Sequence, residues 1–132
     1  ELKEKKDRVE DAIYATKAAL KEGIVPGGGS ALYWASQKIK PTNVGEEILL
    51  KAIRAPFYTI LDNAGILNAD VINEEYHGVN VITGECVDMV EAGVVDPVLV
   101  TKSALKNACS VVSTIISADC VISNARADES NK

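Results

Sequence analysis

The eight residues 23–30, with the sequence Gly-Ile-Val-Pro-Gly-Gly-Gly-Ser, constrain the fold more than any other stretch of the chain. Before them, apolar residues recur at helical spacing over residues 2–22, and after them the same spacing covers residues 30–38. Three consecutive glycines let the backbone take a positive φ and approach another group closely, and Ser30 is placed to cap the second helix. The sequence therefore predicts a sharp turn between two helices.

This glycine turn has two interpretations. Free N–H groups at the start of the second helix form a geometry that attracts phosphate. Alternatively, Gly23 is an ordinary C-terminal helix cap and Pro26-Gly27 an ordinary turn. Neither the dinucleotide fingerprint nor the Walker pattern is met, because no strand is expected before the turn and no Gly-Lys-Ser/Thr closes it. The turn by itself leaves both interpretations open.

Composition indicates one globular domain. The chain has 132 residues, 47% of them hydrophobic, and a formal net charge of −5. Lys and Arg do not gather into a stripe beyond the first helix, which argues against a nucleic-acid-binding protein. No apolar run approaches the ~20 residues that a membrane-spanning helix needs.

The number and spacing of the cysteine and histidine residues argue against a metal site. Cys86, Cys109 and Cys120 are odd in number and widely spaced, which fits neither a disulfide framework nor a zinc pattern. We expect them to be reduced, partly buried thiols. The single histidine, His77, leaves almost nothing for a histidine-based metal centre or a Ser-His-Asp triad.

The remaining elements are mostly helical. Asn43 and Glu46 form a capping box that opens a helix, Pro56 breaks or kinks it, and Gly65 ends the apolar stripe that follows. A short helical turn is expected over residues 68–72, and a longer helix runs from Asp96-Pro97 to about residue 117, with Asp96 as its N-cap. Because the first helix begins at residue 1 without a cap, we expect the sequence to be cut from a longer one.

Two stretches read as β-structure. Apolar residues at Val79, Val81 and Ile82 precede Thr83-Gly84, and others follow it, so a short hairpin is expected. Residues 120–122 read as one short strand, which needs a partner edge from another chain or another part of the protein. The fold class expected is mainly α, with one small hairpin and a short C-terminal strand.

Six stretches, taken together, are similar to one known family. They are EKKDRVEDA (4–12), EGIVPGGG (22–29), AP (55–56), NAG (63–65), DMVEAGVVDP (88–97) and SALKNA (103–108). In this order and spacing they resemble the group I chaperonins, the GroEL family, in one register from residue 1 to about residue 124. Several separate motifs in the correct order are far more specific than any one of them.

The resemblance implies a domain organisation and an activity. Residues 1–22 would be the helix that leads from the intermediate domain, residues 23–124 the C-terminal half of the helical equatorial domain, and residues 125–132 a polar tail. In that family the equatorial domain holds ATP and makes most contacts within and between two seven-membered rings. The intact ATPase encloses a non-native client protein under a co-chaperonin lid. The location implied is the bacterial cytosol, or the mitochondrial matrix or plastid.

The resemblance also implies roles for individual residues. Asp11 falls where the family has its catalytic carboxylate, which orients or activates the attacking water near Mg²⁺ and the γ-phosphate. Gly28 falls in the turn near the ribose and adenine of ATP, Asn80 on the adenine-contacting hairpin, and Asp96 where a carboxylate bonds the ribose hydroxyls. The phosphate loop and the Mg²⁺ ligand belong to a part of the family outside this chain, so these residues alone should bind ATP poorly or not at all.

Val81 and Ile82 are further candidates for the adenine site. They follow Asn80, where the family usually has two small residues, so their bulk is expected to crowd adenine or change the tilt of the hairpin. The family's Gly-Gly-Met tail is replaced here by residues 125–130.

Other interpretations remain open at this point. Asp11 can be an ordinary solvated side chain of a charged helix, and Asp96 can serve as a helix cap, as a ribose ligand, or as both. The whole chain can be a stand-alone oligomerisation or interaction module without nucleotide activity. A small enzyme that pairs Asp11 with a second carboxylate is a third possibility, although no second carboxylate stands out.

Overall fold

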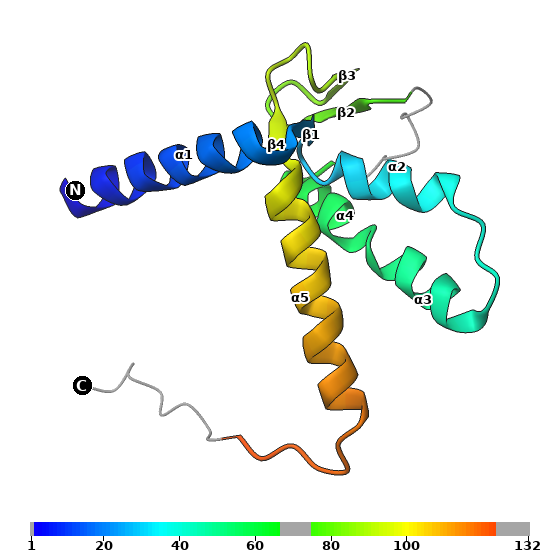
Figure 1. The fold of residues 1–132 in the computed structure, drawn as a ribbon. Coiled ribbons are helices and arrows are strands. Elements are labelled where there is room, and N and C mark those ends of the chain that lie inside the picture. The colour runs from blue at the N-terminus through cyan, green and yellow to red at the C-terminus, as the bar shows by residue number, and fades with distance from the viewer. Residues whose placement is uncertain (1, 67–74, 124–132) are drawn as a thin grey trace.

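The computed structural model describes residues 2–66 and 75–123, and these form a mainly helical unit with two small strand pairs. Figure 1 shows α1 (Leu2–Glu22) and α5 (Val98–Ile116) diverging from one junction, where β1 (Ile24–Pro26) meets β4 (Val95–Pro97). The other helices, α2 (Ser30–Lys38), α3 (Val44–Ala52) and α4 (Ala55–Asn63), lie on the opposite side of α5 from α1. The mainly helical fold expected from the sequence is confirmed.

The glycine turn is correctly predicted as a break between two helices, but its cap differs. Gly29, not Ser30, occupies the N-cap position of α2, with a left-handed φ of 77°. Ser30 is the first helical residue, and its buried hydroxyl donates a hydrogen bond to the carbonyl of Gly27. The serine therefore stabilises the turn by bonding back to it instead of capping the helix.

The capping residue of α3 is confirmed. The side chain of Asn43 accepts a hydrogen bond from the Glu46 N–H over 2.9 Å. The Glu46 carboxylate accepts from the Thr42 N–H, at 2.6 Å, instead of from the Asn43 N–H of the expected capping box, and this hydrogen bond lowers the pKa of Glu46. α3 ends at Ala52 and α4 begins three residues later with proline in its first turn, so Pro56 separates two helices as expected.

The hairpin is confirmed with shorter strands than expected. β2 (His77–Asn80) pairs antiparallel with β3 (Glu85–Asp88), and Asn80 lies opposite Glu85. Val81 and Ile82, expected in the first strand, lie in the connecting turn. The correction has a local cause, because the Asn80 side chain accepts a hydrogen bond from the Ile82 N–H at 3.0 Å and so ends the strand.

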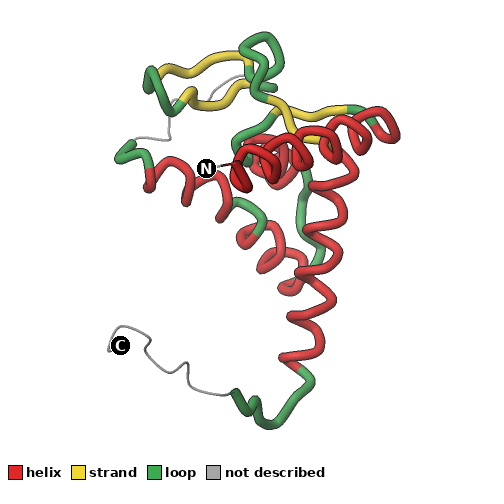
Figure 2. The backbone as a smooth tube through the Cα atoms, turned by 90° about the vertical axis from the view of Figure 1, so that its left-hand side faces the viewer, coloured by secondary structure: helices red, strands yellow, loops and turns green. Residues whose placement is uncertain are grey.

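A second strand pair was not predicted. β1 pairs antiparallel with β4, and Val25 lies opposite Asp96. Because Asp96 belongs to this strand, α5 begins two residues later at Val98, and its N-cap is Pro97 without a side-chain hydrogen bond. The expectation that Asp96 caps the helix is therefore wrong. Figure 2 shows both strand pairs at one end of the molecule, from which the helices extend.

A small core holds the helices against the hairpin. Phe57, Leu61 and Val79 form its buried centre, and the partly buried side chains of Tyr33 and Trp34 pack against them. The Trp34 indole N–H also donates a hydrogen bond, of 2.8 Å, to the carbonyl of His77. α2, α4 and β2 are therefore joined directly.

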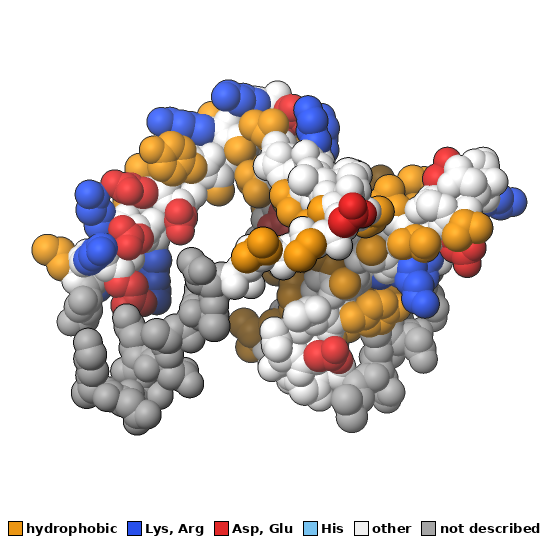
Figure 3. Space-filling view, turned by 90° about the horizontal axis from the view of Figure 1, so that it is seen from below, with side chains coloured by type: hydrophobic (Ala, Val, Ile, Leu, Met, Phe, Trp, Pro, Cys, Tyr) orange, Lys and Arg blue, Asp and Glu red, His pale blue; other side chains and the backbone are white. Residues whose placement is uncertain are grey.

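Much apolar surface remains open outside this core. None of the residues of α5 is buried, and the exposed side chains include Val111, Val112, Ile115 and Ile116. Hydrophobic side chains lie open on the face of the molecule in Figure 3, while Lys, Arg, Asp and Glu side chains are interspersed along α1. An apolar helix face of this kind is typical of a surface that packs against further protein.

Several expectations concern the chain beyond these elements. Residues 120–122 form no strand in the structure, so the expected C-terminal strand is absent from the described residues. The helical turn expected over 68–72 and the tail 125–132 lie outside the described residues. Cys86, Cys109 and Cys120 form no disulfide within the described residues, and Cys120 is exposed instead of partly buried. No described helix is both long and apolar enough to span a membrane.

Candidate functional site

The glycine turn is fixed against the loop that precedes β4. The Gly27 N–H donates a hydrogen bond, of 2.8 Å, to the carbonyl of Val94. A Cβ atom at Gly27 would lie 3.0 Å from that same carbonyl oxygen, which leaves no room for a larger side chain. The turn that carries Gly28 is thereby placed beside the strand that carries Asp96, because β1 leads into the turn and pairs with β4.

Asp96 carries a carboxylate that is partly removed from water. Its side chain is half-buried, and this burial raises the pKa of Asp96 above its ordinary value. Among residues 2–66 and 75–123, no hydrogen-bond or ion-pair partner satisfies this carboxylate. A desolvated carboxylate with unused acceptor oxygens is suited to receive hydroxyl donors from a ligand.

Asp96→Asn should therefore stabilise the unliganded protein in a pH-dependent way. The folded protein holds the Asp96 proton more tightly than the unfolded chain does, so the ionised carboxylate costs stability as the pH rises through its raised pKa. Urea unfolding of both proteins between pH 3 and 8 should show equal stability at the acid end and an advantage of the variant that grows with pH and then levels off. An advantage that is largest at acid pH would contradict the raised pKa.

Asn80 lies at the far end of the hairpin from the glycine turn. Its amide oxygen is used within the chain by the hydrogen bond from the Ile82 N–H. Val81 and Ile82 lie in the turn beyond it, and Ile82 is 91% exposed. These side chains are therefore available to a neighbouring group, but the described residues do not enclose them.

Asp11 is separate from the other candidates. It lies near the middle of α1 and is exposed, about 16 Å along the helix axis from the end of α1 at Glu22. The base of α1 contacts β4 and α5, where Lys102 forms an ion pair of 2.7 Å with Glu22. The structure thus places the turn that carries Gly28 beside the strand that carries Asp96, at the base of the α1 arm, and Asp11 farther out on the arm.

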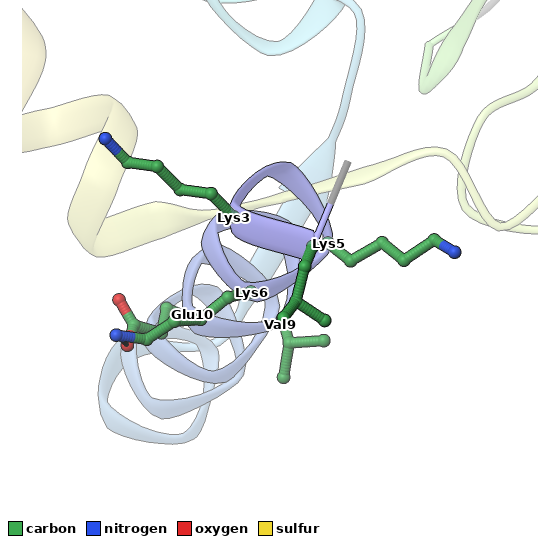
Figure 4. A pocket seen from close by; sticks show the side chains of 6 residues that line it. Lys3, Lys5, Lys6, Val9 and Glu10 are labelled. Atoms are coloured by element: carbon green, nitrogen blue, oxygen red, sulfur yellow. Dashed lines mark ion pairs between the residues drawn. The ribbon is translucent and has the colours of Figure 1, made fainter.

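The most evident hollows are elsewhere. Figure 4 shows one on the N-terminal part of α1, lined by Lys3, Lys5, Lys6, Val9 and Glu10 together with Leu2. Its charged side chains spread outward from a single helix, so it is open surface and not a binding cleft. A second hollow lies between α2 and α3. Neither includes a candidate site residue, and no cluster of three potential metal ligands occurs within residues 2–66 and 75–123.

Sequence reasoning missed Met89, which lies in the centre of this region. The residue follows β3 directly and is only 2% exposed. Its side chain contacts both Gly28 and Gly78, so it joins the glycine turn to the hairpin. The one available signal was that the only methionine of the chain falls within the stretch 88–97.

Comparisons with known proteins identify the family of this chain. The sequence profile described as the TCP-1/cpn60 chaperonin family matches residues 1–126. A solved structure described as a group III chaperonin in the open state is similar to this chain, with 28% sequence identity and a TM-score of 0.66. That match covers 80% of this chain and 25% of the chaperonin, so the chain spans about a quarter of the length of that relative. Because the family profile covers nearly every residue, this chain belongs to the TCP-1/cpn60 chaperonin family.

Proposed function

We propose that this chain is the nucleotide-facing C-terminal part of an ATP-driven protein-folding chaperonin of group I. Residues 1–22 would belong to the intermediate domain and residues 23–124 to the equatorial domain. ATP and Mg²⁺ would be bound jointly with a further part of the protein, which supplies the phosphate loop and the Mg²⁺ ligand. Ring assembly, a co-chaperonin lid, non-native client proteins and a bacterial cytosolic location complete the proposal.

The observation that carries the proposal is the state of Asp96. Its half-buried carboxylate has unused acceptor oxygens and lies on a strand paired with the one that leads into the Gly28 turn. The ribose of ATP has two neighbouring hydroxyl groups, and these can donate hydrogen bonds to the carboxylate oxygens that no described residue uses. Gly28 and the hairpin that carries Asn80, Val81 and Ile82 would lie along the adenosine.

Asp11 would raise the rate of ATP hydrolysis and would not contribute to the affinity for the nucleotide. It is an exposed carboxylate without a hydrogen-bond or ion-pair partner among the described residues, so nothing there competes for its oxygens. Such a group can orient a water molecule and accept its proton when the γ-phosphate is brought close to it. Its position on the projecting α1 arm makes that approach dependent on how the arm lies in the whole subunit.

The test is ATP binding by the full-length protein and its Asp96→Ala variant. We expect the parent protein to bind ATP and the variant to bind it about ten-fold more weakly, the loss typical of charge-assisted hydrogen bonds to a ligand. Isothermal titration with ATP and with 2′,3′-dideoxy-ATP measures both. Removal of the sugar hydroxyls should weaken binding to the parent and have little effect on the variant. A parent protein that binds no ATP would refute the proposed function.

The open apolar face of α5 favours a second role in subunit assembly. Val111, Val112 and Ile115 are exposed on a helix that has no buried residue among those described. An interaction module would associate through such a surface without nucleotide. Light scattering of the full-length protein, combined with the ATP titration and a hydrolysis assay, separates the two functions, since an oligomer that neither binds nor hydrolyses ATP would support the interaction module alone.

A further inference from the structure

The backbone around Met89 is held from several directions. The Met89 N–H donates to the carbonyl of Tyr76 over 3.2 Å, and the Met89 carbonyl accepts from the Val94 N–H over 2.8 Å. Next to it, the Asp88 carboxylate accepts hydrogen bonds from the Val90 and Glu91 N–H groups, of 2.8 and 2.9 Å. The backbone of Met89, from which its side chain projects, is therefore fixed relative to both the hairpin and the loop before β4.

The side chain of Met89 fills the space beside two glycines. A Cβ atom at Gly78 would lie 2.7 Å from Met89 Cγ and 2.9 Å from its Sδ. A Cβ atom at Gly28 would lie 3.1 Å from Met89 Cε at the other end of the same side chain. The thioether thus lies between β2, which carries Gly78, and the turn that carries Gly28.

Backbone hydrogen bonds connect the glycine turn, the loop that carries Met89 and the hairpin. Val94 accepts from the Gly27 N–H and donates to the Met89 carbonyl, so the glycine turn is tied to the loop from which Met89 projects. The hairpin is tied to that loop by the Tyr76 carbonyl. The backbone is joined on both sides and the Met89 side chain fills the space that remains, so a change in its volume must be taken up by a shift of the turn or the hairpin.

We propose that Met89 is a positioning residue for the nucleotide, because its side chain sets the spacing between the Gly28 turn and the β2–β3 hairpin. The adenosine part of ATP would lie across the open side of these two walls, outside the Met89 side chain that fills the space between them, so the inference rests on the proposed function. Met89 touches protein on both sides and is not a ligand to the nucleotide. Its loss should change the affinity for ATP and leave the chemical step, which depends on Asp11, nearly unchanged.

The test is steady-state ATP hydrolysis by the full-length protein and its variants. We expect Met89→Ala to raise KM for ATP about ten-fold with kcat changed by less than about two-fold, and Met89→Leu to remain close to the parent, since it retains most of the volume. Leu50→Ala is the matched control, because Leu50 is 7% exposed on α3 and its truncation removes similar volume away from these walls. That control should lower the melting temperature without raising KM.

A second pair of variants keeps the test decisive if Met89→Ala folds poorly. Gly78→Ala should raise KM, because its methyl group would push the Met89 side chain away. Adding Met89→Ala to Gly78→Ala should bring KM back toward the parent value, which a merely structural role would not produce. An ATP-hydrolysing parent with KM unchanged in Gly78→Ala or in folded Met89→Ala overturns the positioning role alone. A parent that neither binds nor hydrolyses ATP instead overturns the proposed function.

Discussion

Replacing Asp11 by asparagine in the full-length protein is expected to lower the rate of ATP hydrolysis by about 10²-fold or more, while ATP binding is nearly unchanged. The amide retains the shape of the carboxylate but can neither accept a proton nor attract the developing positive charge on the attacking water. Because Asp11 is exposed and has no partner among the described residues, the free energy of unfolding should change by less than about 0.5 kcal/mol.

Single-turnover hydrolysis combined with an ATP titration measures the two effects separately. Asp7→Asn is the matched control, since Asp7 is also an exposed aspartate of α1 and its replacement removes the same charge one helical turn earlier. We expect that control to hydrolyse ATP at close to the parent rate. Equal rates in Asp11→Asn and the parent would return Asp11 to the role of a solvated side chain on a charged helix.

The elements predicted correctly from the sequence are those whose causes are local. The bounds of α1 and α2 follow from apolar spacing, and the Asn43 cap follows from a hydrogen bond between residues three apart. Gly65 was expected to end the fourth helix, and it follows the C-cap Ala64 with a φ of 72°. Each of these features depends on a few neighbouring residues that the sequence shows directly.

The elements missed depend on residues distant in the chain. β1 and β4 have three residues each, too few for an alternating pattern, and more than sixty residues separate them. The pair Asp96-Pro97 is a good local start for a helix, but pairing with Val25 holds Asp96 in an extended conformation and moves the helix start to Val98. Here tertiary pairing overrides a local preference.

In the candidate site, too, the features that depend on residues distant in the chain could not be predicted from the sequence. Resemblance to a family pointed to Asp96 as a ribose ligand, but its half-buried state and unused oxygens depend on the β1–β4 pair and are visible only in three dimensions. For Met89 the sequence offered only its place within the stretch 88–97, because one methionine in a loop forms no pattern. Its role follows from the close approach of its side chain to Gly28 and Gly78, which lie 50 residues apart in the sequence.

Gly29→Ala is expected to lower the free energy of unfolding by about 3 kcal/mol or more, and two costs add to give that value. The φ of 77° at Gly29 is left-handed, which costs a residue with a Cβ atom about 1–2 kcal/mol. The new Cβ atom would also lie 2.8 Å from the backbone nitrogen of Phe57 and 2.9 Å from its Cα, so α2 and α4 would have to separate. Overpacking of this kind costs about 1–3 kcal/mol.

Gly65→Ala separates the two costs, because Gly65 has a similar φ of 72° but no atom within 4 Å of an added Cβ. We expect that variant to lose only about 1–2 kcal/mol in urea unfolding followed by circular dichroism. The difference between the two variants then measures how closely the turn approaches α4. Since Gly29 adjoins Gly28, Gly29→Ala should also weaken ATP binding by the full-length protein, whereas Gly65→Ala should not. Equal losses of stability in the two variants would mean that the turn does not rest against Phe57 in solution.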